Sequence, residues 1–398
     1  MEHKTRIKGN VHYVGVNDRN KHRFEGMWPL PYGVSYNSYL IDDEMVALVD
    51  TVDICYFEVY LRKIKQVIGE RPINYLIINH MEPDHSGSIR LIKQHYPEII
   101  IVGNKQTFGM IEGFYGVTGE QYLVKEGDFL ALGHHKLRFY MTPMVHWPET
   151  MMTFDETDGV LFSGDGFGCF GTVDGGFLDT RINVDKYWGE MVRYYSNIVG
   201  KYGSPVQKAL QKLGGLPISV ICSTHGPVWT ENIAKVIGIY DRLSRYDADE
   251  GVVIAYGSMY GNTEQMAEAI AEELSAQGVK NIVMHNVTKS HPSYIIADIF
   301  RYKGLIIGSP TYSNQIFPEV EALLSKILLR EVKGRYLGYF GSFTWAGAAV
   351  KRLAEFAEKS KFELVGDPVE MKQAMKDLTY TQCENLARAM ADRLKKDR

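Results

Sequence analysis

The sequence of 398 residues predicts an α/β protein built from two parts. Residues 1–248 are expected to form an αββα sandwich, in which two β-sheets pack together and helices cover their outer sides. Residues 249–398 are expected to form a doubly wound parallel sheet of strand order 2-1-3-4-5. Two observations support this division. Strands crowd the start of the chain, whereas apolar strands and helices alternate regularly after a charged stretch at residues 240–251.

Apolar alternation and helical spacing define the elements expected in the first part. Alternation predicts strands at residues 11–16, 38–41 and 45–50, with an acidic turn between the last two. Helical spacing predicts helices over residues 54–68 and 87–96. This order of strands followed by interleaved helices is typical of a layered α/β domain.

An aromatic segment and several isolated histidines complete the first part. Residues 185–198 are expected to be helical, with Tyr194 and Tyr195 in the core or at an interface rather than at a metal ion. Histidines outside the clusters described below, among them His12 and His135, are expected at the solvated surface.

A cluster of residues able to bind metal follows a buried strand. Residues 73–79 form an apolar run of strand length, and residues 80–85 read His-Met-Glu-Pro-Asp-His. These side chains stand where a strand ends, the position at which sites are built in open α/β sheets. Imidazole and carboxylate groups together suit iron, zinc or manganese. The plainer alternative is a polar loop with helix-capping acids. The candidate ligands are His80, Glu82, Asp84 and His85.

Three more residues of ligand type occupy matching positions later in the chain. They are His146, Asp165 and His225, which follow or end the strand-like runs at residues 136–145, 159–164 and 218–224. A single histidine at a strand end is usually a loop or core residue. Four such placements in one part of the chain predict a convergent metal site.

The second part opens with a strand, a loop of hydroxyls and glycine, and a helix. Residues 252–257 form a continuous apolar strand, and residues 264–277 form an amphipathic helix that ends at Gly278. Backbone N–H groups at the start of such a helix make a cradle for a phosphate. The loop lacks the motifs of NTPase and dinucleotide loops, so a single terminal phosphate is the better match. Its residues are Ser258, Met259, Tyr260, Gly261, Asn262 and Thr263.

Two later loops are expected beside this phosphate loop. In a sheet of order 2-1-3-4-5 the loops after the third and fourth strands flank the loop after the first. Tyr312 and Trp345 would then lie on either side of a flat ring. The other strands are expected at residues 282–285, 304–308, 336–341 and 363–365. The two loops contain Ser309, Pro310, Thr311, Tyr312, Ser313 and Asn314, and Ser342, Phe343, Thr344, Trp345, Ala346 and Gly347.

Composition excludes several classes of protein. The net charge of −4 and the absence of a Lys/Arg run argue against a nucleic-acid partner. No apolar run approaches membrane-spanning length, and the N-terminus lacks the apolar core of a signal peptide. The four cysteines are scattered without a CxxC pair, which argues against a disulfide framework and against cysteine-ligated zinc or iron. A cytoplasmic protein with reduced thiols is expected.

The pattern His-x-Glu-x-Asp-His, followed by His146, Asp165 and His225, resembles the metallo-β-lactamase fold. Hydrolytic zinc members of that fold usually carry histidine where Glu82 stands, and a carboxylate there favours iron. The phosphate loop and its two neighbours resemble flavodoxin, which implies FMN. Over essentially its full length the chain resembles a flavodiiron protein, or A-type flavoprotein, of the two-domain class without a rubredoxin extension.

The resemblance implies a role for each candidate ligand. One iron would be bound by His80, Glu82 and His146, and the other by Asp84 and His225. The resemblance further implies that Asp165 bridges the two irons and that His85 stays beside the metal rather than on it. Thr344 and Ala346 stand where family members often have glycine and serine, so the flavin contacts of that loop depart from the family pattern.

The resemblance also implies an activity and partners. Two ferrous irons and reduced FMN together hold the four electrons that convert O2 to water, and two electrons convert two NO to N2O. An oxygen reductase, nitric oxide reductase, or both, is therefore expected. A rubredoxin or an NADH-linked flavoprotein would supply electrons, and a head-to-tail homodimer or a dimer of dimers would bring FMN to the irons of another subunit.

Two other functions remain open at this stage. The first is a metal hydrolase in which a metal-bound water attacks the substrate and the flavodoxin part is a passenger. The second is a flavin electron carrier that catalyses no reaction. Bound iron favours the reductase, bound zinc the hydrolase and no metal the carrier. The preference between O2 and NO does not follow from the sequence.

Overall fold

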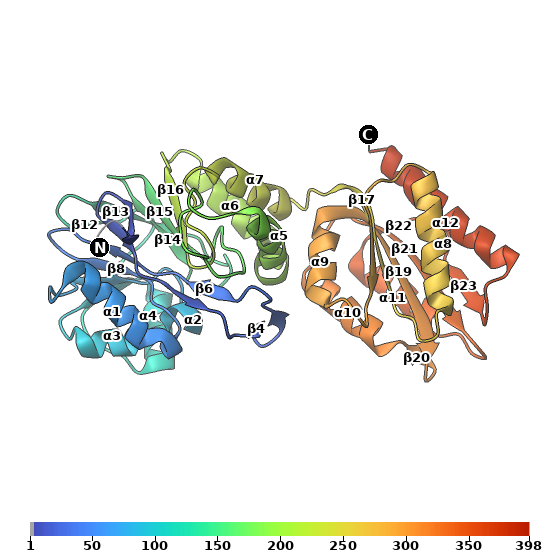
Figure 1. Ribbon diagram of the computed structural model, residues 1–398, viewed down its shortest axis with the longest axis horizontal. Helices are drawn as coiled ribbons and strands as arrows, with labels where there is room; N and C mark the ends of the chain where they lie inside the picture. The colour runs from blue at the N-terminus through green and yellow to red at the C-terminus, as the bar shows by residue number, and fades with distance from the viewer. Residues whose placement is uncertain (1–3, 398) are drawn as a thin grey trace. The chain divides into compact units, whose positions relative to one another are not determined.

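The computed structural model describes residues 4–397 (Figure 1). The chain divides into two compact units. The first contains the chain up to Tyr195 together with Tyr202–Asp241, and the second contains Ser196–Lys201 and the chain from Arg242 onward. The boundary predicted after residue 248 lies slightly beyond this division and stays a prediction.

Two β-sheets form the centre of the first unit, as the sequence predicts. A seven-stranded sheet has the order β1-β2-β7-β8-β9-β10-β11, and a five-stranded sheet has the order β12-β13-β14-β15-β16. The strands of the first sheet are β1 (Arg6–Lys8), β2 (Val11–Tyr13), β7 (Tyr39–Ile41), β8 (Ala47–Val49), β9 (Tyr75–Ile77), β10 (Ile100–Gly103) and β11 (Gln121–Leu123). Those of the second are β12 (Phe129–Ala131), β13 (Lys136–Met141), β14 (Met151–Asp155), β15 (Val160–Gly164) and β16 (Val220–Ser223).

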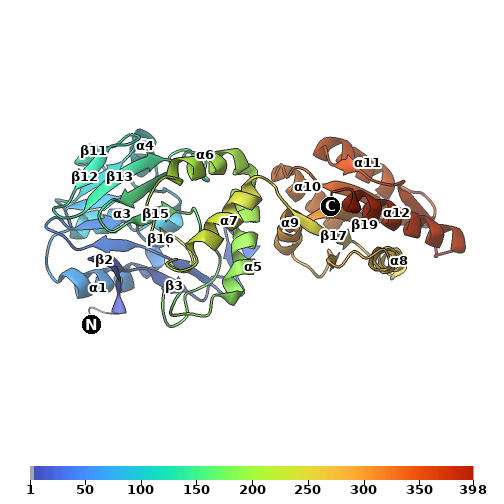
Figure 2. The same cartoon turned by 90° about the horizontal axis from the view of Figure 1, so that it is seen from above.

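The apolar core of this unit lies between the two sheets. Tyr39 and Ile77 of the first sheet belong to one buried cluster with Phe139 and Phe162 of the second. In the views of Figures 1 and 2, helices of the segment up to residue 115 cover the first sheet, and later helices cover the second. They are α1 (Phe57–Ile68), α2 (Pro83–Ser86), α3 (Ile89–His95) and α4 (Lys105–Tyr115), then α5 (Asp185–Tyr194), α6 (Gly203–Leu213) and α7 (Ile233–Ser244).

Short elements surround this frame. Two small ladders join β3 (Val16–Asp18) to β6 (Val34–Tyr36) and β4 (Arg23–Phe24) to β5 (Trp28–Pro29). A 3₁₀ turn at Ile54–Tyr56 precedes α1, and π-helical (Tyr195–Val199) and 3₁₀ (Gly200–Tyr202) turns follow α5. The regular α-helix predicted over residues 185–198 therefore ends earlier, at Tyr194. Tyr194 and Tyr195 are buried as expected.

The second unit is a doubly wound sheet with the predicted strand order. The order β18-β17-β19-β21-β22 corresponds to 2-1-3-4-5 along the chain. Helices α8 and α12 pack together, and α9, α10 and α11 form the other contact group. The strands are β17 (Asp249–Tyr256), β18 (Ile282–Asn286), β19 (Tyr302–Tyr312), β20 (Gln315–Ile316), β21 (Tyr336–Phe343), β22 (Glu363–Leu364) and β23 (Val369–Lys372). The helices are α8 (Asn262–Ala276), α9 (Pro292–Arg301), α10 (Pro318–Leu329), α11 (Ala349–Ser360) and α12 (Asp377–Lys395).

Three local expectations were wrong. Residues 309–312, expected as a loop, continue β19, and Ser313–Asn314 form the two-residue turn of a hairpin with β20, both at positive φ. His12 and His135, expected at the surface, are buried. For His135 the reason is a partner that lies across a β-hairpin, because its Nδ1 lies 3.0 Å from a carboxylate oxygen of Asp155.

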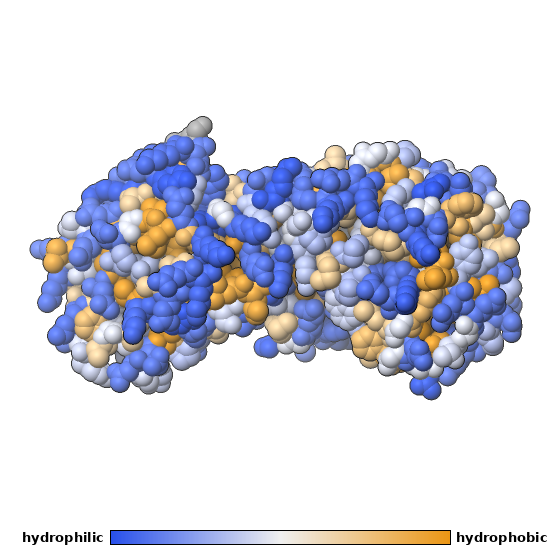
Figure 3. Space-filling model, turned by 180° about the vertical axis from the view of Figure 1, so that it is seen from behind, coloured by the Kyte–Doolittle hydropathy of each residue, from blue (hydrophilic) through white to orange (hydrophobic). Residues whose placement is uncertain are grey.

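On the face shown in Figure 3, hydrophilic side chains cover most of the surface and apolar ones form scattered patches. No helix within residues 4–397 has the length and apolar character needed to cross a bilayer. The cysteines Cys55, Cys169, Cys222 and Cys383 are free thiols.

Candidate metal centre and flavin site

The candidate metal ligands lie just beyond the ends of strands from both sheets. His80 follows β9 of the first sheet, and Asp165 and His225 follow β15 and β16 of the second. His146 lies in the loop between β13 and β14. Glu82 and Asp84 lie at the start of the short helix α2, which the sequence pattern did not reveal. Every predicted metal ligand therefore reaches the same edge of the sandwich.

The first group consists of His80, Glu82, His146 and Asp165, with one donor atom of each within 4.8 Å of the others. His146 Nε2 lies 2.9 Å from Asp165 Oδ2 and 3.2 Å from Glu82 Oε2. His80 Nε2 lies 3.5 Å from the same Glu82 oxygen. All four side chains are buried, so their donors face one enclosed point.

The second group consists of Asp84, His85 and His225. His225 Nε2 lies 3.4 Å from Asp84 Oδ2 and 3.8 Å from Asp165 Oδ1. His85 Nε2 lies 2.9 Å from the same Asp165 oxygen, so its imidazole faces the group. Its expected place beside the metal rather than on it stays a prediction. The two oxygens of Asp165 thus point toward different groups, the geometry of a bridging carboxylate.

Residues that the sequence reasoning missed hold these donors in place. Asp50, at the end of β8, accepts hydrogen bonds from the Asn79 backbone N–H at 2.8 Å and the Asn79 side chain at 3.1 Å. Burial raises the pKa of Asp50 to about 6. Glu149 Oε1 lies 2.8 Å from His80 Nδ1. Asp50 could have been found by the strand-end rule used for the ligands, whereas Glu149 follows no sequence pattern.

The loops predicted to hold the flavin meet at the carboxyl edge of the sheet in the second unit. Gly261 precedes α8 with φ of +88°, a conformation that favours glycine, and its N–H donates to Ser258 Oγ at 3.2 Å. Thr263 Oγ1 lies 2.9 Å from Ser342 Oγ, which joins the phosphate loop to the end of β21. Trp345 is 79% exposed and Tyr312 is 48% exposed, so both rings have open surface. Contacts with a flavin stay a prediction.

Comparisons with known proteins match this arrangement. A family model described as ODP family beta lactamase matches residues 34–226, and one described as Flavodoxin matches residues 254–385. An anaerobic nitric oxide reductase flavorubredoxin from Vibrio vulnificus is 32% identical, with 90% of this chain and 73% of the relative covered. The corresponding Escherichia coli protein is 31% identical, covering 90% and 76%.

Solved structures agree with the sequence matches. The rubredoxin oxygen:oxidoreductase of Desulfovibrio gigas superimposes with a TM-score of 0.95 at 31% identity, covering 98% of both chains. The flavodiiron protein of Giardia intestinalis has a TM-score of 0.91 at 26% identity, covering 98% of this chain and 97% of its own. This chain belongs to the flavodiiron proteins. The family resemblance and the fold inferred from the sequence are therefore confirmed.

As a flavodiiron protein, the chain has a non-haem diiron centre and FMN as its cofactors, and its donor groups fit two metal ions. Buried donor atoms without a hydrogen-bond partner in the described structure converge on the two groups. Leaving such atoms unpaired is costly, so their convergence indicates that metal ions satisfy them. These atoms are His80 Nε2, Glu82 Oε2, both carboxylate oxygens of Asp84, His85 Nε2 and His225 Nε2.

Several proposed ligands of this flavodiiron protein, among them His80, His146 and Asp84, hold protons that a metal must displace. Burial alone would lower the pKa of His146, but its hydrogen bond to Asp165 and the neighbouring Glu82 carboxylate raise it to about 9. Burial raises the pKa of Asp84 to about 7. These ligands bind metal in their deprotonated forms, so metal binding releases protons at neutral pH.

We therefore expect metal affinity to rise with pH between 6 and 8. Below its pKa each displaced proton contributes roughly a tenfold gain in affinity per pH unit. Anaerobic competition with a chelator, corrected for the chelator's own protonation, measures this slope on the metal-free protein. An affinity that does not change over this range would contradict the proposed protonation of His146 and Asp84.

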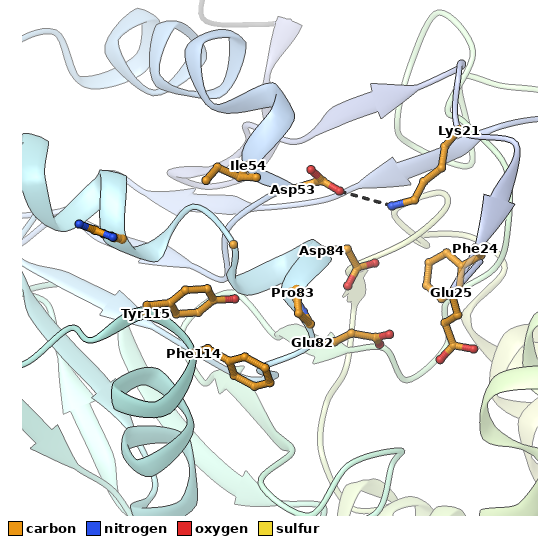
Figure 4. Close-up of a pocket in the computed structure, with 12 residues that line it drawn as sticks. Lys21, Phe24, Glu25, Asp53, Ile54, Glu82, Pro83, Asp84, Phe114 and Tyr115 are labelled. Atoms are coloured by element: carbon orange, nitrogen blue, oxygen red, sulfur yellow. Dashed lines mark hydrogen bonds and ion pairs between the residues drawn. The ribbon is translucent and has the colours of Figure 1, made fainter. Parts of the chain in front are cut away.

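A cavity of about 450 Å³ opens next to the metal groups of this flavodiiron protein (Figure 4). The carboxylates of Glu82 and Asp84 point into the space that faces Phe24 and Glu25. Lys21 lines the same cavity, and its Nζ lies 3.4 Å from Asp53 Oδ2. Since a water molecule occupies about 30 Å³ in the liquid, the cavity is much larger than a diatomic gas requires.

Proposed function

We propose that this flavodiiron protein is an oxidoreductase that reduces O2 to water, NO to N2O, or both. The observation that carries the proposal is the orientation of Asp165, whose two oxygens face two separate sets of histidine and carboxylate donors. The relatives support both substrates, because the Vibrio and Escherichia proteins are named as nitric oxide reductases and the Desulfovibrio protein as an oxygen oxidoreductase.

In this proposal the protein binds the irons through the residues described above. His80, Glu82 and His146 would hold one iron, Asp84 and His225 would hold the other, and Asp165, whose oxygens face both groups, would contribute to both. Glu82 and Asp84 border the cavity, so a small ligand reaches the centre from that side. When bound, iron and FMN supply coordination positions and electrons.

Tyr194 is positioned to donate a hydrogen bond near the centre. Its ring lies 5.7 Å from the ring of His225, and its hydroxyl is buried without a hydrogen-bond partner in the described structure. Burial raises the pKa of Tyr194 well above its usual value, and the charge of Asp165 raises it further. The hydroxyl therefore remains protonated at neutral pH and is available as a hydrogen-bond donor.

The hydrolase alternative is less well supported. Glu82 places a carboxylate in the first group, and hard oxygen donors favour iron over zinc. The carrier alternative leaves the convergent, unpaired donor atoms without a purpose.

We expect purified protein to contain iron and FMN, and its reduced form to consume O2 or NO. The His80→Ala variant should lose at least about tenfold in rate, because even changes behind a metal ligand typically cost 10–100-fold. Metal analysis and gas-electrode assays on both proteins test this. Gas consumption no faster than in His80→Ala, or zinc in place of iron, would reject the reductase.

We also propose a head-to-tail homodimer, or a dimer of dimers, in which the flavin of one subunit serves the diiron centre of another. The cavity beside Glu82 and Asp84 supports this, because it exceeds the size of either gas. Sedimentation showing only monomers at working concentration would count against it.

A rubredoxin or an NADH-linked flavoprotein is the proposed electron donor. The free thiols support a cytoplasmic location.

A further inference from the structure

The two metal groups differ in what stands behind their histidines. His80 Nδ1 lies 2.8 Å from Glu149 Oε1, so the imidazole that faces the first group is backed by a carboxylate. His225 Nδ1 lies 2.7 Å from the backbone carbonyl oxygen of Ser35, so the imidazole that faces the second group is backed by a neutral acceptor. Both contacts select the tautomer that leaves Nε2 free for metal.

Glu149 is held firmly in this position. Its side chain is completely buried, and Oε1 also accepts the backbone N–H of Met81 at 2.9 Å. Its own carbonyl oxygen accepts a hydrogen bond from the Asn104 side chain at 2.6 Å, which fixes the loop that carries it. The ring of Trp147 stands perpendicular to that of His80, with centroids 5.4 Å apart.

The charge of Glu149 acts mainly on His80. Within the described part of the chain, its one ion-pair partner is His80, and Oε2 has no hydrogen-bond partner. A buried carboxylate that accepts an imidazole N–H raises the basicity of the opposite ring nitrogen and adds negative charge beside the metal. A backbone carbonyl supplies only a dipole.

We propose that Glu149 widens the difference between the two metal positions, so that the one formed by His80, Glu82 and His146 binds metal more tightly than the one formed by Asp84 and His225. Glu149 is thus a positioning residue that acts through His80. The inference rests on the proposed ligand assignment and does not depend on which gas is reduced.

The test is anaerobic titration of metal-free protein with Fe(II), with Mn(II) as a redox-stable probe. Wild-type protein should bind metal in two resolved steps. Glu149→Gln keeps the shape and one acceptor oxygen but removes the charge, so the tighter step should weaken by about 10–100-fold while the weaker step stays within about threefold. Metal binding without gas consumption would reject the proposed function and leave this inference standing.

A matched control separates this effect from the loss of any buried carboxylate. Asp155 Oδ2 lies 3.0 Å from His135 Nδ1 in the same sandwich, and both side chains are buried. Asp155→Asn should leave both binding steps unchanged. Equal weakening of both steps in Glu149→Gln, or the same loss in Asp155→Asn, would overturn the proposal.

A second measurement needs no variant and covers the case in which Glu149→Gln fails to fold. Wild-type crystals prepared with one Mn(II) per chain should show anomalous density at the position of His80, Glu82 and His146. Equal density at both positions, or density mainly beside Asp84 and His225, would overturn the proposal.

Discussion

Replacing Asp165 with alanine is expected to remove both metal ions from the protein. Asp165 is buried, and its two oxygens face the two donor groups at 2.9 Å from His146 Nε2 and 2.9 Å from His85 Nε2. Residues behind a ligand typically contribute 10–100-fold to metal affinity, so loss of a ligand shared by both ions should cost more than about 100-fold. Metal analysis after dialysis measures the loss.

The control for this variant is Asp155→Ala. Asp155 is equally buried and also contacts a histidine, but it belongs with His135 and Asp158 to a separate group outside the two metal groups. It should retain the iron content of the wild-type protein even where its stability falls. Full iron occupancy in Asp165→Ala would contradict the bridging role.

The second large effect is expected at Arg335, which is buried in the flavodoxin unit. Its guanidinium donates to the backbone carbonyl oxygens of Ile299 at 2.6 Å, Phe300 at 2.8 Å and Tyr246 at 2.9 Å. Two of these carbonyls lie at the C-terminal end of α9. Burial lowers the pKa of Arg335 to about 10, so it remains charged at neutral pH.

Arg335→Met should lower the free energy of unfolding of this unit by at least about 3 kcal/mol, because it strands several buried carbonyl groups. Urea denaturation followed by circular dichroism and FMN release measures the change. Arg393→Met is the control, because its partners Glu363 and Asp397 form a surface network. An unchanged urea midpoint in Arg335→Met would contradict this account.

The sequence predicted that the candidate metal ligands lie close together, because one rule governs their placement. His80, Asp165 and His225 each follow an apolar strand, and parallel strands of a layered domain end at a common edge. The same rule placed the phosphate loop after β17. These predictions needed only an apolar run of strand length and the identity of the residues that follow it.

Other features escaped because they depend on contacts between distant segments. Glu149 meets His80 from a different loop, and Asp155 buries His135 across a β-hairpin. No local pattern records either pair. Residues 309–312 form strand rather than loop because the hairpin with β20 extends β19 beyond its apolar run.

The most direct test of the account is anaerobic stopped-flow mixing of the fully reduced protein with O2 and, separately, with NO. Flavin and iron absorbance would be recorded together. The account predicts rapid reoxidation of both chromophores by at least one gas, which would also name the substrate. Slow flavin reoxidation, with an iron signal that changes with neither gas, would contradict it and bring the hydrolase alternative forward.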